Sequence, residues 1–341
     1  MVTIEQVARH AHVSVATVSR VLNSSPTVKP ATAERVRSAI NELHYIPNQS
    51  ARNLRRNENR VLLALAPNFS NPYYSRILTG IGDLAREREY SVLICNTAGS
   101  GENERHFLTM LERHRADGAI LLGCHRDYTW LGELAGRFPI VQCCEYVPEL
   151  NAPSVSIDNY AAAFETVTFL QKLGHRNIAM VGADNLYIST QLRRKGYRDA
   201  LTAAGCVPLP SCYAEADADY SFVSGQEAAK KLLTLEPRPT AVFCVSDILA
   251  LSVISVAQEM GLSVPADLTV TGFDDVDYTT MFHPFLTTVA QPCYEMGRQS
   301  TALALDLLQG NAEKTAERSF IPHRLVVRES SAPPPRKSVK H

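Results

Sequence analysis

The chain has 341 residues, 45% hydrophobic and 20% charged, an ordinary globular composition that allows two or three domains. It contains no apolar run of 18 residues and does not begin with a basic segment followed by an apolar one, so we expect neither a membrane span nor a secretory signal. Eight cysteines without metal-binding spacing favour reduced thiols in a cytoplasmic protein without a bound metal.

Charge is divided unevenly along the chain. Residues 1–60 contain nine basic and four acidic side chains, a net charge of +5, which leaves −6 for the rest of the protein. A basic head on an acidic body predicts that the head alone binds an anionic partner.

Three short helices are predicted in an all-α domain over residues 1–46. Thr3 is suited to cap a helix over 4–11, and Ser14 is suited to cap a second over 15–23. A third amphipathic helix is expected over 31–43. Two short helices joined by a tight turn and supported by a third are typical of a helix-turn-helix.

The second helix is expected to enter the major groove of DNA. Val15 and Ala16 can contact a thymine methyl group, and Arg20 can donate two hydrogen bonds to guanine. A three-helix module for another kind of partner is the alternative. The residues suited to phosphate oxygens are Ser14, Thr17 and Asn23.

A basic linker follows over residues 47–60. Pro47 ends the third helix, and the next segment is too short and too charged to be a stable helix alone. It is either a disordered linker or a hinge that becomes helical on DNA, with Leu54 wedged between base steps of the minor groove. The linker residues expected at the DNA are Asn48, Ala51, Leu54 and Arg55.

From residue 61 to 330, continuous apolar runs alternate with helical stretches. Such runs fit strands buried on both faces of parallel sheets. The pattern restarts near residue 160, which predicts two doubly wound α/β lobes, followed by a disordered tail over 331–341. The predicted strands are 61–67, 91–97, 118–123, 139–145, 177–183, 241–247 and 268–275.

The pattern T-I-x-x-V-A-x-x-A-x-V-S-x-A-T-V-S-R-V-L-N, followed by Y-x-P-N-x-x-A-R-x-L, resembles the lac-repressor/gal-repressor family of bacterial transcription regulators. The resemblance covers nearly the whole chain. It implies a body like a periplasmic binding protein, whose chain crosses between the lobes near residues 159, 290 and 322. It also implies that the side chains matching Val15, Ala16 and Arg20 read bases, that Leu54 intercalates, and that Ala51 packs on a dimer mate.

A cleft between the strand ends of the two lobes is the expected effector site. Tyr73 and Tyr74 could stack on a ligand or pack against their own helix, and Arg193 could bind a ligand or form an ion pair. The resemblance assigns Asp274 to the ligand, although Asp275 is chemically as plausible. The predicted effector-binding residues are Tyr73, Tyr74, Glu145, Arg193, Tyr220, Ser246 and Asp274.

The resemblance implies a ligand-responsive repressor. A single helix-turn-helix makes few base contacts, so we expect a dimer on a pseudo-palindromic operator, and the C-terminus has no heptads for a tetramer. A transport binding protein is disfavoured by the basic head and the missing signal. An enzyme is disfavoured because the chain lacks the common phosphate-loop, dinucleotide, nucleophile-elbow and zinc-protease motifs. We expect no cofactor, and both a nucleoside and a sugar remain open as the effector, because a nucleoside also presents a ribose.

Overall fold

The computed structural model describes residues 2–23, 25–45, 58–123, 128–207, 209–311 and 317–335. The chain divides into two compact units, Met1–Asn59 and Arg60–His341, called here the head and the body. None of the helices in the described segments is long and apolar enough to span a membrane. The predicted linker contacts Asn48, Ala51, Leu54 and Arg55 lie outside the described residues.

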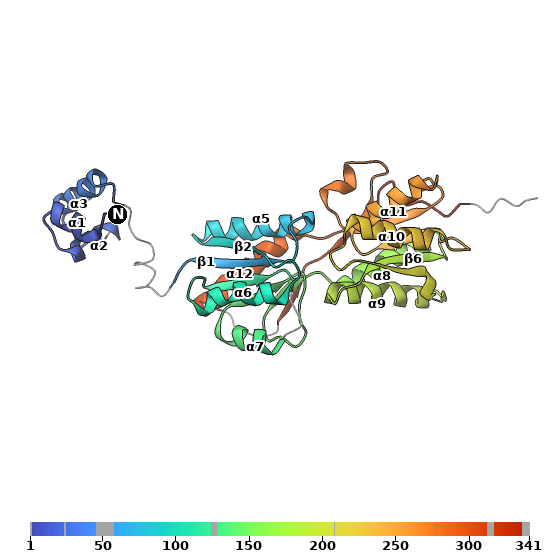
Figure 1. The fold of residues 1–341 in the computed structure, drawn as a ribbon, viewed down its shortest axis with the longest axis horizontal. Helices are drawn as coiled ribbons and strands as arrows, with labels where there is room; N and C mark the ends of the chain where they lie inside the picture. Colours follow the sequence, from blue (N-terminus) through green and yellow to red (C-terminus); the bar gives the residue numbers. More distant parts are fainter. Residues whose placement is uncertain are drawn as a thin grey trace, which may run out of the picture. The chain divides into compact units, whose positions relative to one another are not determined.

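Three helices form the head: α1 (Ile4–His10), α2 (Val15–Leu22) and α3 (Pro30–Glu42) (Figure 1). Thr3 and Gln6 cap α1 reciprocally, because each side chain accepts a hydrogen bond from the backbone of the other. The Ser14 hydroxyl accepts from the Thr17 backbone at 3.2 Å and so begins α2. The three predicted helices are therefore confirmed to within one residue at each end.

The first lobe of the body is built on six parallel strands. These are β1 (Val61–Ala66), β2 (Ser91–Asn96), β3 (Gly118–Leu121), β4 (Ile140–Cys143), β5 (Ser154–Ser156) and β11 (Arg318–Phe320). Their order is β11-β5-β4-β3-β1-β2, which makes β2 an edge strand.

Helices cover both faces of the first sheet. They are α5 (Pro72–Glu87), α6 (Gly101–Glu112), α7 (Tyr128–Arg137) and α12 (Cys293–Gln309). Successive side chains of β1 point to opposite faces: Ala64 belongs to the buried cluster that includes α5 and α12, whereas Leu63 belongs to the cluster with α6 and α7. Burial on both faces explains why the strands read as continuous apolar runs.

The second lobe repeats this architecture. Its strands are β6 (Ile178–Ala183), β7 (Tyr213–Ala216), β8 (Ala241–Cys244), β9 (Thr269–Asp274), β10 (Thr287–Ala290) and β12 (Arg324–Val326). Their order is β12-β10-β9-β8-β6-β7, and β12 alone runs antiparallel to its neighbour. Figure 1 shows α8 (Asn159–Lys172) and α9 (Ile188–Ala203) on one side of this sheet and α10 (Phe222–Leu233) and α11 (Asp247–Glu259) on the other.

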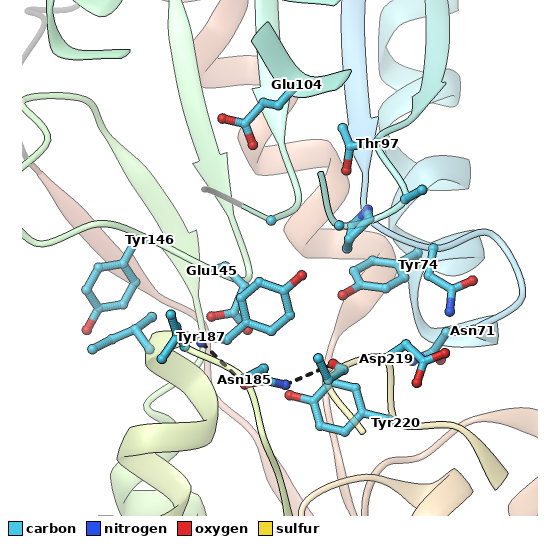
Figure 2. Close-up of a pocket in the computed structure, with 18 of the residues that line it drawn as sticks. Asn71, Tyr74, Thr97, Glu104, Glu145, Tyr146, Asn185, Tyr187, Asp219 and Tyr220 are labelled. Atoms are coloured by element: carbon cyan, nitrogen blue, oxygen red, sulfur yellow. Dashed lines mark hydrogen bonds between the residues drawn. The ribbon is translucent and has the colours of Figure 1, made fainter. Parts of the chain in front are cut away.

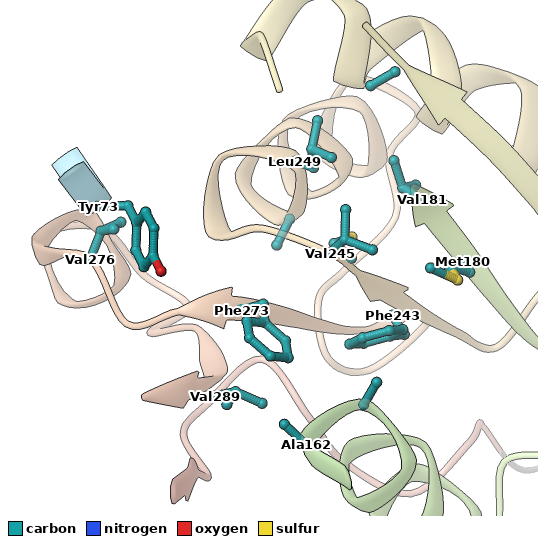
Figure 3. Close-up of a cluster of buried hydrophobic side chains, with 14 of the residues drawn as sticks. Tyr73, Ala162, Met180, Val181, Phe243, Val245, Leu249, Phe273, Val276 and Val289 are labelled. Carbon is teal, nitrogen blue, oxygen red and sulfur yellow. The ribbon is translucent and has the colours of Figure 1, made fainter. Parts of the chain in front are cut away.

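The chain passes between the lobes three times. It leaves the first sheet after β5, returns from β10 through α12 to β11, and re-enters the second sheet at β12. The positions predicted from the resemblance, near 159, 290 and 322, fall within these three connections. One buried cluster extends across both lobes, so that Tyr73 of the first lobe belongs to the same cluster as Phe273 and Val276 of the second (Figure 3).

The seven predicted strands are confirmed, and five short strands were not predicted: β5, β7, β10, β11 and β12. The predicted start of the disordered tail is wrong for Ser331 and Ala332. The Ser331 hydroxyl bonds that of Thr287 at 2.8 Å, and the Ala332 carbonyl accepts from Thr269 at 2.9 Å. These bonds tie the two residues to the second sheet, because Thr269 and Thr287 are the first residues of β9 and β10.

Candidate functional site

Helix α2 presents a polar and small-residue face outside the core of the head. Val18 and Val21 point into the core, whereas Ser14, Ala16, Arg20 and Asn23 are exposed, and Val15 and Thr17 are partly buried. This separation follows from the helical spacing of the apolar residues. The predicted DNA-contacting residues of this helix therefore lie together on the part of its surface that the core leaves free.

The polar groups of this face differ in how they are engaged. The Ser14 hydroxyl bonds that of Thr17 at 2.9 Å, and the Asn23 amide donates to the Ser19 carbonyl at 2.9 Å. Within the described residues, the Arg20 guanidinium forms no hydrogen bond or ion pair. Arg20 is thus available to an external acceptor, while Ser14 and Asn23 stabilise the ends of the helix.

A cavity of about 760 Å³ lies in the body, with walls from both lobes (Figure 2). Its lining comes from the loops and helix starts that follow β1, β2, β3 and β4 of the first sheet and β6 and β7 of the second. The carboxyl ends of parallel strands are where ligands of doubly wound folds bind. The lining residues fall within 67–74, 96–104, 123, 145–149, 184–191 and 218–220.

Three of the seven predicted effector residues line this cavity: Tyr74, Glu145 and Tyr220. Figure 2 shows their side chains converging on one space, Tyr74 from the start of α5 and the other two from loops. The Tyr220 hydroxyl bonds Thr190 at 2.6 Å, whereas the Tyr74 hydroxyl has no hydrogen-bond partner among the described residues. The Tyr74 side chain is 6% exposed and lines the cavity, so its hydroxyl is open to whatever occupies that space.

Glu145 joins the two lobes at the base of the cavity. One carboxylate oxygen accepts from the Ser189 backbone at 3.1 Å, and the other accepts from the Ser189 hydroxyl, both at the start of α9 in the second lobe. The carboxylate lies at the positive end of the helix dipole, which stabilises it. Burial outweighs these bonds and raises the pKa of Glu145 to about 7.

Glu145 should make the stability of the ligand-free protein depend on pH. Its folded-state pKa of about 7 exceeds the ordinary value of 4.5, so the folded state binds more protons than the unfolded state between these values. The free energy of unfolding should therefore fall as pH rises across this window, by up to roughly 3 kcal/mol. Melting curves of wild type and Glu145→Gln between about pH 5 and pH 8 measure this, because glutamine still accepts from Ser189 but does not titrate.

Asp274 should contribute to the same pH dependence of stability. Burial also raises its pKa to about 7, so the Glu145→Gln profile should be flatter than that of wild type without becoming level. A profile as steep as that of wild type would assign the pH dependence to Asp274 or another group.

The other four predicted effector residues are buried and do not line the cavity. The Tyr73 hydroxyl donates to Gln291 at 3.2 Å, and Ser246 caps α11 by accepting from the Leu249 backbone. Arg193 and Asp274 lie 3.8 Å apart as an ion pair, and Gln291 donates to Asp274 at 2.7 Å. The structure therefore brings Arg193 and Asp274 together, and their contact with a ligand stays a prediction.

Arg193 is held from several directions. Its guanidinium donates to Asn159 at 2.8 Å and to the Val245 carbonyl at 2.5 Å, and it stacks 3.7 Å from the centre of the Phe273 ring. Of the two roles predicted for Arg193, binding a ligand or forming an ion pair, the structure shows the ion pair with Asp274. Asp275 is engaged elsewhere, because Arg328 donates to it at 2.6 Å.

Several residues that line the cavity were not predicted. They follow strands closely, but nothing in their type distinguishes them from ordinary loop residues. Asp219 had the weakest signal, because the preceding strand β7 was itself not predicted. The main additional lining residues are Asn71, Thr97, Glu104, Asn185, Tyr187 and Asp219.

Comparisons with known proteins agree with both units. The pattern of bacterial regulatory proteins of the lacI family matches residues 3–48, and that of the periplasmic binding protein-like domain matches residues 167–331. The HTH-type transcriptional repressor CytR of Escherichia coli (strain K12) is 39% identical over 309 residues, which cover 90% of each chain. The chain belongs to the lacI family of bacterial regulatory proteins.

Solved structures of this family share the fold. The lac repressor dimer bound to operator and the anti-inducer ONPF has a TM-score of 0.88 at 28% identity, and the match covers 97% of this chain and 99% of that one. The complex of the transcriptional regulator CelR with cellobiose has a TM-score of 0.74 at 32% identity, covering 97% and 100%. The predicted family and fold are thus confirmed. The likeness to the cytidine repressor that stretches such as FLTTVAQPCYEMGR suggest agrees with the presence of CytR among the relatives.

Proposed function

We propose that this lacI-family regulator is a ligand-responsive repressor that binds a pseudo-palindromic operator as a dimer and takes a nucleoside or a sugar into the body cavity. The observation that carries the proposal is the cavity of about 760 Å³, whose walls come from both lobes. A ligand that contacts both walls binds one arrangement of the lobes more tightly than another, and so shifts their equilibrium.

The head supplies the DNA contact. Helix α2 would lie in the major groove with Val15, Ala16 and Arg20 at the base edges, while Ser14 and Thr17 meet phosphate oxygens. The guanidinium of Arg20 is exposed and has no partner in the described part of the head, which supports this orientation.

The linker would carry the signal. In our proposal Asn48 begins a short helix that forms on the operator, Ala51 packs against its copy in the dimer mate, Leu54 enters the minor groove and Arg55 binds phosphate. Closure of the lobes around the effector would change the distance between the two linkers of a dimer.

Exposed apolar side chains of the body support the dimer. Leu93 and Ile94 lie on the edge strand β2 and are 42% and 50% exposed, and Met281 and Phe282 are 57% and 67% exposed. An apolar edge strand left in water is prone to pair with another chain, so a second copy is a suitable cover. The lac repressor with a similar fold is a dimer on its operator.

The effector class follows from size and from relatives. The cavity volume lies within the range of small-molecule sites and accommodates a nucleoside or a disaccharide. CelR was solved with cellobiose, which supports a sugar, whereas the likeness to the cytidine repressor supports a nucleoside.

The proposal is tested by a thermal-shift screen of nucleosides and sugars on the full chain, followed by operator binding with each hit. A compound that binds only the folded state must raise the melting temperature. The proposal requires that at least one such compound also changes operator affinity. Hits that leave operator affinity unchanged would argue against a ligand-responsive regulator.

Arg20→Ala should reduce the affinity for an operator selected from random DNA by about tenfold to a hundredfold, because a two-pronged guanine contact is worth about 1–3 kcal/mol. Affinity for non-specific duplex should change much less. Arg37→Ala is the control, because Arg37 is exposed on α3 and pairs with Glu34 at 3.5 Å. Equal losses on both DNAs in Arg20→Ala would reassign Arg20 to the phosphate backbone.

A further inference from the structure

The turn directly after β9, residues 275–277, is held in place by the second lobe and is called here the β9 turn. Asp275 has a positive φ of 58°, a backbone conformation that is uncommon outside glycine and depends on the surrounding contacts. Asp247, the fully buried first residue of α11, accepts a hydrogen bond from the Val276 backbone at 2.9 Å. Arg328 donates to the Asp275 carboxylate at 2.6 Å. The position of the β9 turn is therefore fixed relative to the second sheet.

Arg76 of α5 reaches the β9 turn from the first lobe. Its guanidinium donates to the Asp275 carbonyl at 2.7 Å and forms an ion pair with the Asp277 carboxylate. The Arg76 and Asp277 side chains are 42% and 64% exposed, so their ion pair alone would contribute little. The hydrogen bond to a carbonyl that the second lobe holds in place strengthens the contact. Arg76 and the β9 turn thus join the two lobes, and this contact is called here the Arg76 latch.

The Arg76 latch differs from the other links between the lobes. The three connections of the chain join the lobes covalently and are the places where the lobes can pivot. The hydrogen bonds of Glu145 with Ser189 also cross between the lobes, but Glu145 lines the cavity and is open to a ligand. Neither Arg76 nor the β9 turn lines the cavity. The latch can therefore favour one arrangement of the lobes without touching the effector.

We propose that the Arg76 latch stabilises the arrangement of the lobes seen in this structure and so sets the operator affinity of the effector-free protein. A non-covalent contact of this kind forms only where the lobes bring its partners together, so its loss shifts the equilibrium towards other arrangements. The inference rests on the proposed function, in which the arrangement of the lobes controls operator binding. It adds a determinant of that control which lies outside the cavity and outside the head.

The first test measures the affinity of the effector-free full chain for an operator selected from random DNA. Arg76→Ala should change this affinity by about threefold or more. Asp277→Ala should change it less but in the same direction, because the hydrogen bond to the Asp275 carbonyl remains. The double variant should show no larger change than Arg76→Ala alone, because both substitutions remove the same contact. A long-range effect of charge on DNA would instead move the two single variants in opposite directions, since one loses a cation and the other an anion.

Arg86→Ala is the matched control. Arg86 is an exposed arginine on the same helix, and it pairs at 2.8 Å with Asp83 of that helix, so its ion pair stays within one lobe. Its removal should leave operator affinity nearly unchanged. The inference would be overturned by opposite shifts in the two single latch variants, by additive shifts in the double variant, or by an Arg76→Ala affinity equal to that of wild type.

The second test uses the reciprocity of linked equilibria. Cytidine, adenosine, ribose and cellobiose are titrated into wild type and Arg76→Ala by calorimetry. Any of them that alters the operator affinity of wild type should bind Arg76→Ala with an affinity changed by about threefold or more, although Arg76 does not line the cavity. Equal binding of such a compound to both proteins would contradict the latch. Failure of the proposed function has a separate signature: compounds that bind wild type would leave its operator affinity unaltered.

Discussion

Arg193→Ala is expected to lower the melting temperature of the body by roughly 5–10 °C and to weaken effector binding by tenfold or more. Without the guanidinium, the Asn159 side chain and the Val245 carbonyl lose donors at 2.8 and 2.5 Å, and Asp274 loses its cationic neighbour. Breaking a buried pair in this way costs about 3 kcal/mol or more, which corresponds to several degrees in a domain of this size. Calorimetric melting and ligand titration of the full chain measure the two effects.

Arg194→Ala provides the matched control. This neighbouring arginine is exposed, pairs with Glu215 at 3.4 Å and stacks on Tyr213, so its removal should cost less than about 1 kcal/mol. Arg193→Lys keeps the charge but loses the planar fork, and should recover only part of the stability. If Arg193→Ala lowered the melting temperature yet bound the effector normally, Arg193 would be a residue of the lobe core and not of the site.

The strands that could be predicted are those buried on both faces. Residues 61–66 and 241–244 read as continuous apolar runs because helices cover each side of their sheets. The missed strands are short, and several are polar, such as Ser154–Ser156 and Arg318–Phe320. Their strand form depends on pairing with neighbours far away in sequence, for which a local pattern carries no signal.

Helix starts in the head could be predicted because their causes are local. The hydroxyls of Thr3 and Ser14 each accept from a backbone N–H three residues later, a geometry that depends on neighbouring residues alone. The interior of the candidate site has no such local cause. Arg193 and Asp274 are 81 positions apart in the sequence, so no local pattern predicts that they are in contact. Only the family resemblance placed both residues in the same site.

Some of the predicted effector residues line the cavity and others are buried behind it, and this difference also depends on contacts between residues far apart in the sequence. Tyr73 and Tyr74 are adjacent, yet Tyr73 turns toward Gln291 while Tyr74 faces the cavity. Successive helical positions point about 100° apart, so the sequence places one of the pair at the cavity without saying which. The contact between Gln291 and Asp274 then links Tyr73 to the buried ion pair.

Gly80→Ala is expected to destabilise the body by about 3 kcal/mol, because it adds a carbon where α5 and α12 cross. A Cβ at Gly80 would lie 2.1 Å from the Tyr294 carbonyl oxygen, and one at Gly297 would lie equally close to that of Ile77. Backbone atoms cannot yield as flexible side chains do, so the helices must separate, and overpacking of this kind costs about 1–3 kcal/mol or more. Because α12 carries the chain from β10 back to the first sheet, the displacement should also disturb the cavity that lies between the lobes.

Gly82→Ala, two residues along the same helix, isolates this cause. Nothing lies within 4 Å of a Cβ added at Gly82, so the variant should gain about 0.5–1 kcal/mol from the better helix propensity of alanine. The two substitutions are chemically identical and should shift the calorimetric melting temperature in opposite directions. Equal melting temperatures would mean that α5 and α12 can part without cost. That result would show that the close crossing of α5 and α12 does not stabilise the packing of α12 on the first lobe.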